Sequence, residues 1–167
     1  MAYEIFCTIT GASQGDMHTG CNTSDSMGTG FTAAHEDEIR VYWFEEGMQV
    51  AMDPQSGDLP GSRLHKPAEI WKPVDKSSPL LRQALSDKES MDITLTMSWD
   101  NADGEKNTFT ITWTEARFVD FTLVAPGYEY GDNTLPRPTE KWKFTARKIE
   151  WSHDTASTSA SDDWSAA

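Results

Sequence analysis

The stretch GSRLHKPAEIWKPVDKSSPLL, residues 61–81, decides the fold expected for this chain. It begins as a polar loop, continues as a strand over 68–74 and ends in the first turn of a helix. Pro73 lacks the backbone N–H that a sheet ladder needs, so it belongs at a sheet edge or at the end of a strand. The stretch therefore indicates a sheet with a helix next to it in the chain.

The helix is expected over residues 78–88. Ser78 is a favourable N-cap residue, and Pro79 suits the first helical position because its missing N–H is not needed there. Leu81 and Leu85 follow helical spacing and form a narrow apolar stripe. A short helix with one apolar side is expected to pack on a sheet.

Alternating apolar and polar residues predict antiparallel strands on both sides of this helix. Residues 91–99 alternate without error, and the turn sequence DNADGEKN (100–107) joins them to 109–123, which predicts a hairpin. Further strands are expected at 3–9, 38–44 and 141–151, the last with a bulge near 146–148. The sum is a mainly β protein: an antiparallel β-barrel or two-sheet sandwich with one short α-helix packed against it.

Long polar segments separate these elements. Residues 10–34 and 126–138 are expected to be loops, and DPQSGDLPGSR (53–63) is an extended loop that is long for a compact domain, which suggests a function. We expect one domain over 1–153, followed by a Ser/Ala/Asp-rich C-terminal tail over 154–167 that is mobile in a monomer.

Composition restricts the function. The chain has 167 residues, 37% of them hydrophobic, and a formal net charge of −13. This acidity argues against nucleic-acid binding. It also opposes self-association by charge repulsion, so an oligomer would need apolar contacts or paired strands. No apolar run reaches the roughly 18 residues of a membrane helix, and the N-terminus does not resemble a signal peptide. We therefore expect synthesis in a cytoplasm, and export only through a machine that does not need an N-terminal signal.

No residue pattern predicts catalysis, a metal site or a cofactor. The run His35–Glu38 precedes a strand, on which neighbouring side chains diverge, and DNADGE lacks the ligand spacing of a calcium loop. SMGTG (26–30) lacks the lysine that ends a phosphate loop. Cys7 and Cys21 are expected to be free thiols, with Cys7 in the core. The chain is therefore not expected to be an enzyme.

The seven tryptophans offer one alternative, a small carbohydrate-binding β-domain. Five of them lie in phase with neighbouring apolar residues and are expected in the core, which weakens that alternative. These five are Trp43, Trp99, Trp113, Trp142 and Trp151, whereas Trp71 and Trp164 are less certain.

Several separate motifs resemble, in the right order, the haemolysin-coregulated proteins (Hcp), the tube subunits of the bacterial type VI secretion system. They cover nearly the whole chain, and 126–140 is the weakest match. The similar segments are QGDMHTGC (14–21) and DSMG (25–28) after the first strand, HEDEIRVYWF (35–44) in the second strand region, DPQSG (53–57) and GSRLHKP (61–67) in the extended loop, DKSSPLLRQAL (75–85) at the helix start, and ARKIEWSH (146–153) with SDDW (161–164) near the C-terminus.

The resemblance implies a structural protein that forms six-membered rings. Such rings stack into a hollow tube inside a contractile sheath with a spike at its tip, and the tube is secreted from the bacterial cytoplasm and can carry effectors in its lumen. The loop 53–63 is then the expected arm that grips a neighbouring subunit, with interface candidates Asp53, Gln55, Ser56, Asp58, Leu59, Ser62 and Arg63. The polar faces of the hairpin strands could line the lumen or be an ordinary solvated surface, with lumen candidates Asp92, Thr94, Thr96, Ser98, Thr110 and Thr112. An effector enzyme related to a tube subunit is a further alternative, but the resemblance then implies an extra C-terminal domain that we do not expect here.

Overall fold

The computed structural model describes residues 3–127 and 137–164. Their elements, in chain order, are β1 (Tyr3–Gly11), β2 (Gly15–Asp16), α1 (Ser24–Met27), a 3-10 turn (Ala33–His35), β3 (Ile39–Arg40), β4 (Trp43–Glu45), β5 (Met48–Val50), β6 (Arg63–His65), β7 (Ala68–Pro73), α2 (Ser78–Ser86), β8 (Met91–Asp100), β9 (Lys106–Val124), β10 (Thr139–Thr145), β11 (Lys148–His153) and β12 (Thr158–Asp163). The mainly β antiparallel fold with one main helix is confirmed.

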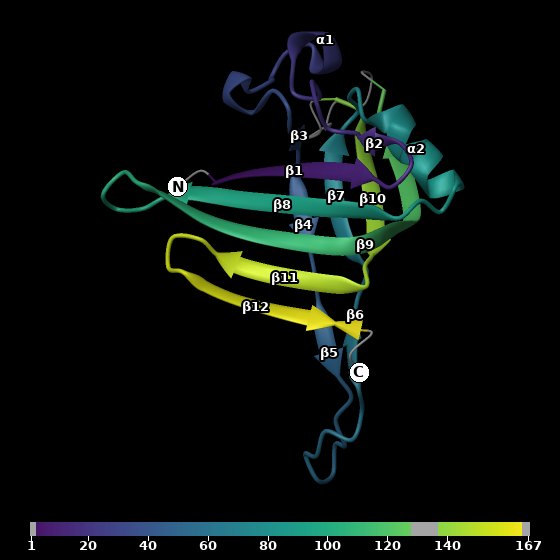
Figure 1. Ribbon diagram of the computed structural model, residues 1–167, viewed down its shortest axis with the longest axis vertical. Coiled ribbons are helices and arrows are strands. Elements are labelled where there is room, and N and C mark those ends of the chain that lie inside the picture. The colour runs from purple at the N-terminus through teal and green to yellow at the C-terminus, as the bar shows by residue number, and fades with distance from the viewer. Residues whose placement is uncertain (1–2, 128–136, 165–167) are drawn as a thin grey trace.

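The long strand β9 joins two sheets (Figure 1). Its first half pairs with β8 and β11, and its second half pairs with β10. Between the halves Glu115 has a φ of 52°, which breaks the extended backbone. The first sheet has the strand order β2-β1-β8-β9-β11-β12, with β3 also on β1, and the second has the order β9-β10-β7-β4.

The core lies between the two sheets and under α2. Ile9, Ile93 and Leu95 of the first sheet are fully buried, as is Trp142 of the second sheet. On α2, Leu81 is completely buried, so the expected apolar stripe does dock on the sheets. Cys7 and Cys21 are both free and buried. Burial raises the pKa of both thiols, that of Cys21 to about 11, because the charged thiolate loses its hydration.

Two predicted strands are each divided in the structure because the chain crosses between the sheets. The predicted strand 38–44 is two short strands, β3 on β1 and β4 on β7. The predicted strand 141–151 is β10 in the second sheet and β11 in the first, so the phase change near 146–148 is a crossing and not a bulge. A register shift does occur, within β10, between Lys143 and Phe144.

Three further expectations need correction. The segment 154–167 was expected to be mobile, but β12 lies in it and pairs with β11 along its whole length. The helix ends at Ser86, and Ser77 is its N-cap, so the prediction that Ser78 is the cap is wrong by one residue. Trp43 is 50% exposed and is not a core residue. The predicted loop 126–138 lies mostly outside the described residues.

Candidate functional site

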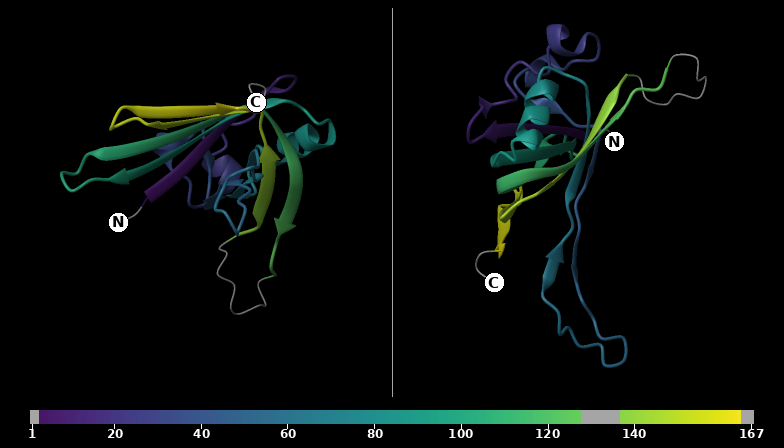
Figure 2. Two further views of the ribbon diagram at one scale, coloured as in Figure 1. Left: turned by 90° about the horizontal axis from the view of Figure 1, so that it is seen from below. Right: turned by 90° about the vertical axis from the view of Figure 1, so that its right-hand side faces the viewer.

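A hairpin arm projects from the body of the protein. β5 and β6 pair with each other in a separate two-stranded sheet, and the chain between them extends away from the two main sheets (Figures 1 and 2). At the tip, Gly57 donates a backbone hydrogen bond to the carbonyl of Asp53 at 2.9 Å, and its φ of 77° favours glycine. The loop 53–63 is therefore an ordered turn at the end of a ribbon.

The arm exposes apolar side chains, which the sequence analysis did not single out. Leu59, one of the interface candidates, is 64% exposed. Exposed apolar side chains gathered on one projecting segment are typical of an interaction surface. The additional exposed apolar residues are Met48, Val50, Met52 and Leu64. The stretch MQVAM (48–52) was the sequence signal that could have revealed them, since it is apolar but adjoins a polar loop.

The other loop candidates divide between the tip and the base of the arm. Four candidates lie in the turn at the tip and are joined by hydrogen bonds. Gln55 donates its N–H to Asp53 Oδ1 at 2.8 Å, and Asp58 donates its N–H to Ser56 Oγ at 3.2 Å. Ser62 is exposed just before β6. Arg63, by contrast, lies at the base and contacts the protein's own body.

The base of the arm is held by Asp162 of β12, an arrangement we call the Asp162 clamp. Asp162 Oδ2 accepts hydrogen bonds from Arg63 Nε at 2.5 Å and from His65 Nε2 at 2.6 Å. Arg63 Nη2 also donates to the carbonyl of Asp163 at 3.0 Å, and the His65 ring packs edge-on against Trp164. The hydrogen bonds from Arg63 and His65 lower the pKa of Asp162. The C-terminal strand thus fixes the direction of the arm.

Replacing Asp162 by asparagine is expected to destabilise the protein at neutral pH and to have almost no effect in acid. A carboxylate whose pKa is lowered by folding stabilises the fold above the unfolded value, near 4 for aspartate, and loses that stabilisation as the pH falls through the lowered pKa. Urea unfolding of both proteins at pH 7 and at the lowest pH where they stay folded would measure this. A difference between the two proteins that does not change with pH would contradict a clamp made by the ionised carboxylate.

The outer face of the first sheet is a continuous polar surface. Opposed residues of an antiparallel pair share a face, and the register sets Thr94 opposite Thr112 and Thr96 opposite Thr110. Ser98 and Asp92 occupy alternate positions of the same strand, so all six lumen candidates lie on one face. β1, β11 and β12 extend the face with Thr8, Glu150, Ser152, Ser159 and Ser161. Short hydroxyl side chains predominate, which suits a surface in contact with water.

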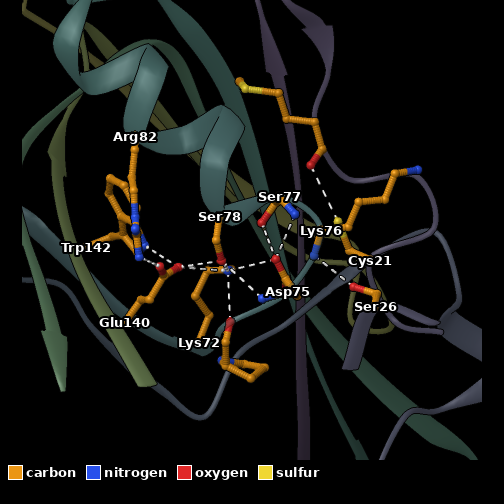
Figure 3. A network of polar contacts seen from close by, with 12 residues as sticks. Cys21, Ser26, Lys72, Asp75, Lys76, Ser77, Ser78, Arg82, Glu140 and Trp142 are labelled. Atoms are coloured by element: carbon orange, nitrogen blue, oxygen red, sulfur yellow. Dashed lines mark hydrogen bonds and ion pairs between the residues drawn. The ribbon is translucent and has the colours of Figure 1, made fainter. Parts of the chain in front are cut away.

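Behind this sheet, a network of charged groups is sealed inside the protein (Figure 3). Lys72 Nζ lies 2.8 Å from Asp75 Oδ1 and 3.1 Å from Glu140 Oε2, and the side chains of all three residues are completely buried. The Ser78 hydroxyl donates to Glu140 Oε2 at 2.8 Å, which is the role it has in place of capping. Arg82 Nη2 donates to Glu140 Oε1 at 2.7 Å from the edge of α2.

Glu140 is held in its charged form by these partners. Burial alone raises its pKa, but the charge of Lys72 and the hydrogen bonds from Ser78 and Arg82 outweigh burial, so its pKa is lowered overall. The network thereby ties α2 to β7 and β10. It holds no exposed nucleophile, and among residues 3–127 and 137–164 no three His, Cys, Asp or Glu side chains are grouped as a metal site would require.

These features define a class of protein: a two-sheet antiparallel β domain with one docked helix, a projecting apolar arm and a broad polar face. The family model "Type VI secretion system effector, Hcp" matches residues 6–153. The chain therefore belongs to the Hcp family of the type VI secretion system, whose members are secreted, β-rich tube proteins, and the predicted resemblance is confirmed.

Individual relatives are similar over almost their whole length. The "Major exported protein" of Pseudomonas aeruginosa is 35% identical, with 98% of this chain and 96% of the relative covered. A solved structure described as a crystal structure of Hcp protein has a TM-score of 0.90 at 32% identity, with 98% of each chain covered. The secreted protein Hcp3 from Pseudomonas aeruginosa has a TM-score of 0.79 at 31% identity, over 98% of this chain and 99% of that one. In the described parts of this chain, no helix is both long and apolar enough to span a membrane.

Proposed function

We propose that this protein is a non-enzymatic tube subunit of a type VI secretion system. In this proposal six copies close into a ring, the rings stack into a tube, and the tube is fired with a spike protein from within a sheath. The polar face of the first sheet lines the lumen, where secreted effectors travel. Export proceeds from the bacterial cytoplasm through this machine, without a signal peptide.

The observation that carries the proposal is the exposed apolar arm. The arm is a two-stranded ribbon that extends beyond the body, is held at its base by Asp162 and presents Met52 and Leu59 to water, so it suits a contact with another ring. Its interface residues are the loop candidates together with the apolar residues of the arm. The hydroxyl-rich outer face supports the lumen assignment because it spans five strands side by side and has few large apolar groups.

Replacing both Met52 and Leu59 by serine is expected to leave a folded subunit and intact rings but to abolish ring stacking. The substitutions remove apolar area from the proposed contact and disturb nothing buried, since both side chains are mostly exposed. Multi-angle light scattering would measure the mass of the particles, and negative-stain microscopy would show rings or tubes.

A matched control is Gln55→Ala, which changes the same tip without removing one of its large apolar side chains or a hydrogen bond of the turn, since Gln55 contributes only its backbone N–H. Deleting residues 54–62 is a stronger test than the double substitution, because it removes the tip and leaves a three-residue connection between β5 and β6. If the Met52 and Leu59 double variant stacks like the wild type, the role assigned to the arm is wrong.

A carbohydrate-binding domain is the second candidate, since one tryptophan pair is accessible. Trp43 is 50% exposed and lies 5.7 Å from Trp71, ring centre to ring centre, and Lys141 Nζ lies 4.0 Å above the Trp71 ring. Exposed aromatic faces of this kind bind sugar rings. Retention on glycan columns that is lost in Trp43→Ser would favour this candidate, whereas rings without glycan retention would favour the tube subunit.

A further inference from the structure

The arm carries two methionines whose side chains are open to solvent. Among the methionines that the structure describes, Met48 is 55% exposed and Met52 is 61% exposed. Met17 and Met91, which lie in the core, are each only 2% exposed. Figure 2 shows the reason for this difference, since the arm extends away from both main sheets. A small oxidant in solution therefore reaches Met48 and Met52 before it reaches the methionines of the core.

A peroxide oxidises the thioether of an exposed methionine by oxygen transfer. The sulfur lone pair attacks one oxygen of the peroxide, so that an S–O bond forms as the O–O bond breaks. The proton on the attacked oxygen moves to the leaving oxygen, which departs as water or an alcohol. The sulfur loses two electrons and the peroxide gains them. The product, methionine sulfoxide, has a polar S=O group in place of an apolar thioether.

The two cysteines do not compete for the oxidant. The thiolate is the reactive form of cysteine, and Cys7 and Cys21 are each only 1% exposed. Burial also raises the pKa of both thiols, so little thiolate is present at neutral pH. Within the part of the chain that the structure describes, Met48 and Met52 are therefore the sulfur groups most open to oxidation.

A sulfoxide on the arm has different consequences in a free subunit and in an assembly. Met48 lies opposite His65 at the base of the arm, and Met52 lies between β5 and the turn at the tip. In the free subunit both side chains are mostly in water, so the S=O groups stay hydrated and the hydrogen bonds of the Asp162 clamp are kept. In a contact that covers the arm, the same S=O groups lose their water and oppose binding unless a donor meets them.

We propose that Met48 and Met52 form a redox-sensitive modification site, at which oxidation by a peroxide blocks the stacking of rings. The inference rests on the proposed function, because the sulfoxides matter only if stacking covers the arm. A stacked tube shields both side chains, so the oxidant acts on free rings and keeps them from stacking. The subunit itself stays folded, and enzymatic reduction of the sulfoxides restores stacking.

Peptide mass spectrometry tests the selectivity of the site. Wild-type rings, kept below the concentration at which they stack, are treated with tert-butyl hydroperoxide and then digested. Met48 and Met52 are expected to gain one oxygen each well before the other methionines of the described chain, Met17, Met27, Met91 and Met97. Circular dichroism should show the same cooperative unfolding before and after treatment. Oxidation of Met17 or Met91 as fast as Met48 and Met52 would overturn the proposed site.

Light scattering and negative-stain microscopy test the effect on stacking. Oxidation is expected to raise the concentration needed for stacking roughly tenfold or more while the rings stay intact. Treatment with the two methionine sulfoxide reductases, one for each sulfoxide epimer, should reverse the effect. The double variant Met48→Leu and Met52→Leu keeps the apolar volume without the sulfur, so it should stack equally well before and after the peroxide.

The results separate this inference from the proposed function. Wild-type rings that stack equally well once Met48 and Met52 are oxidised would overturn the redox site and leave the tube subunit standing. A leucine double variant that loses stacking with peroxide as the wild type does would have the same meaning. Wild-type protein that forms no rings before any treatment would overturn both.

Discussion

Glu140→Ala is expected to lower the free energy of unfolding by about 3–5 kcal/mol, a large part of the stability of a domain of this size. The change removes one of the two carboxylates that balance Lys72, whose ammonium lies 3.1 Å from Glu140 with no exposure to solvent and keeps only Asp75 at 2.8 Å. It also leaves the Ser78 hydroxyl and one Arg82 N–H without their acceptor. Urea unfolding monitored by tryptophan fluorescence would measure the loss.

Two variants separate the network from a general effect of removing charge. Glu150→Ala breaks an ion pair with Lys148 on the surface, where both side chains are at least 36% exposed, and should cost less than about 1 kcal/mol. Glu140→Gln keeps an oxygen acceptor for Ser78, so its loss of stability should lie between the losses of Glu140→Ala and Glu150→Ala. Equal losses in Glu140→Ala and Glu150→Ala would show that the buried network adds no stability.

The pH dependence of the Glu140→Ala effect follows from the lowered pKa. A glutamate has an unfolded pKa near 4.3, so the stabilisation by ionised Glu140 is complete above about pH 5 and falls as the pH drops through the lowered folded value. The difference in stability between the wild type and Glu140→Ala should therefore be constant near neutral pH and shrink in acid.

Local patterns in the sequence were enough to predict the strands, the hairpin and the helix, because each depends on neighbours along the chain. The crossings at 41–42 and 146–147 depend on which strand pairs with which, and alternation carries no such information. The phase change near 146–148 was visible, but a bulge and a crossing change the phase in the same way. β12 was missed because TSASDD has neither apolar alternation nor β-branched enrichment, and its pairing with β11 decides its conformation.

The buried network could have been suspected from phase alone. Glu140 alternates with Trp142 and Phe144, and Lys72 alternates with Ile70 and Ala68, so both charges lie on the apolar face of their strands. Their pairing could not have been predicted, since 68 residues separate them in the chain. The Asp162 clamp could not have been predicted for the same reason, because Arg63 and Asp162 are 99 residues apart in the chain.

Leu81→Asp is expected to abolish folding. Leu81 is completely buried where α2 docks on the sheets, and truncating a buried leucine alone costs about 2–5 kcal/mol. An aspartate there adds the cost of burying a carboxylate with no cation assigned to it, so the sum approaches or exceeds a typical total stability of about 5–15 kcal/mol. The purified variant should show no cooperative thermal transition by circular dichroism.

Neighbouring positions on α2 supply the controls. They separate the loss of helix docking from an effect on helix formation. Gln83→Asp places the same residue on the exposed side of α2 and should cost less than about 1 kcal/mol, while Leu81→Met keeps the apolar volume and should cost less than about 1.5 kcal/mol. Leu85 is half-buried, so Leu85→Asp should destabilise the protein by an intermediate amount. A wild-type melting curve for Leu81→Asp would mean that α2 is not docked, and the ties of Ser78 and Arg82 to Glu140 would then also be absent.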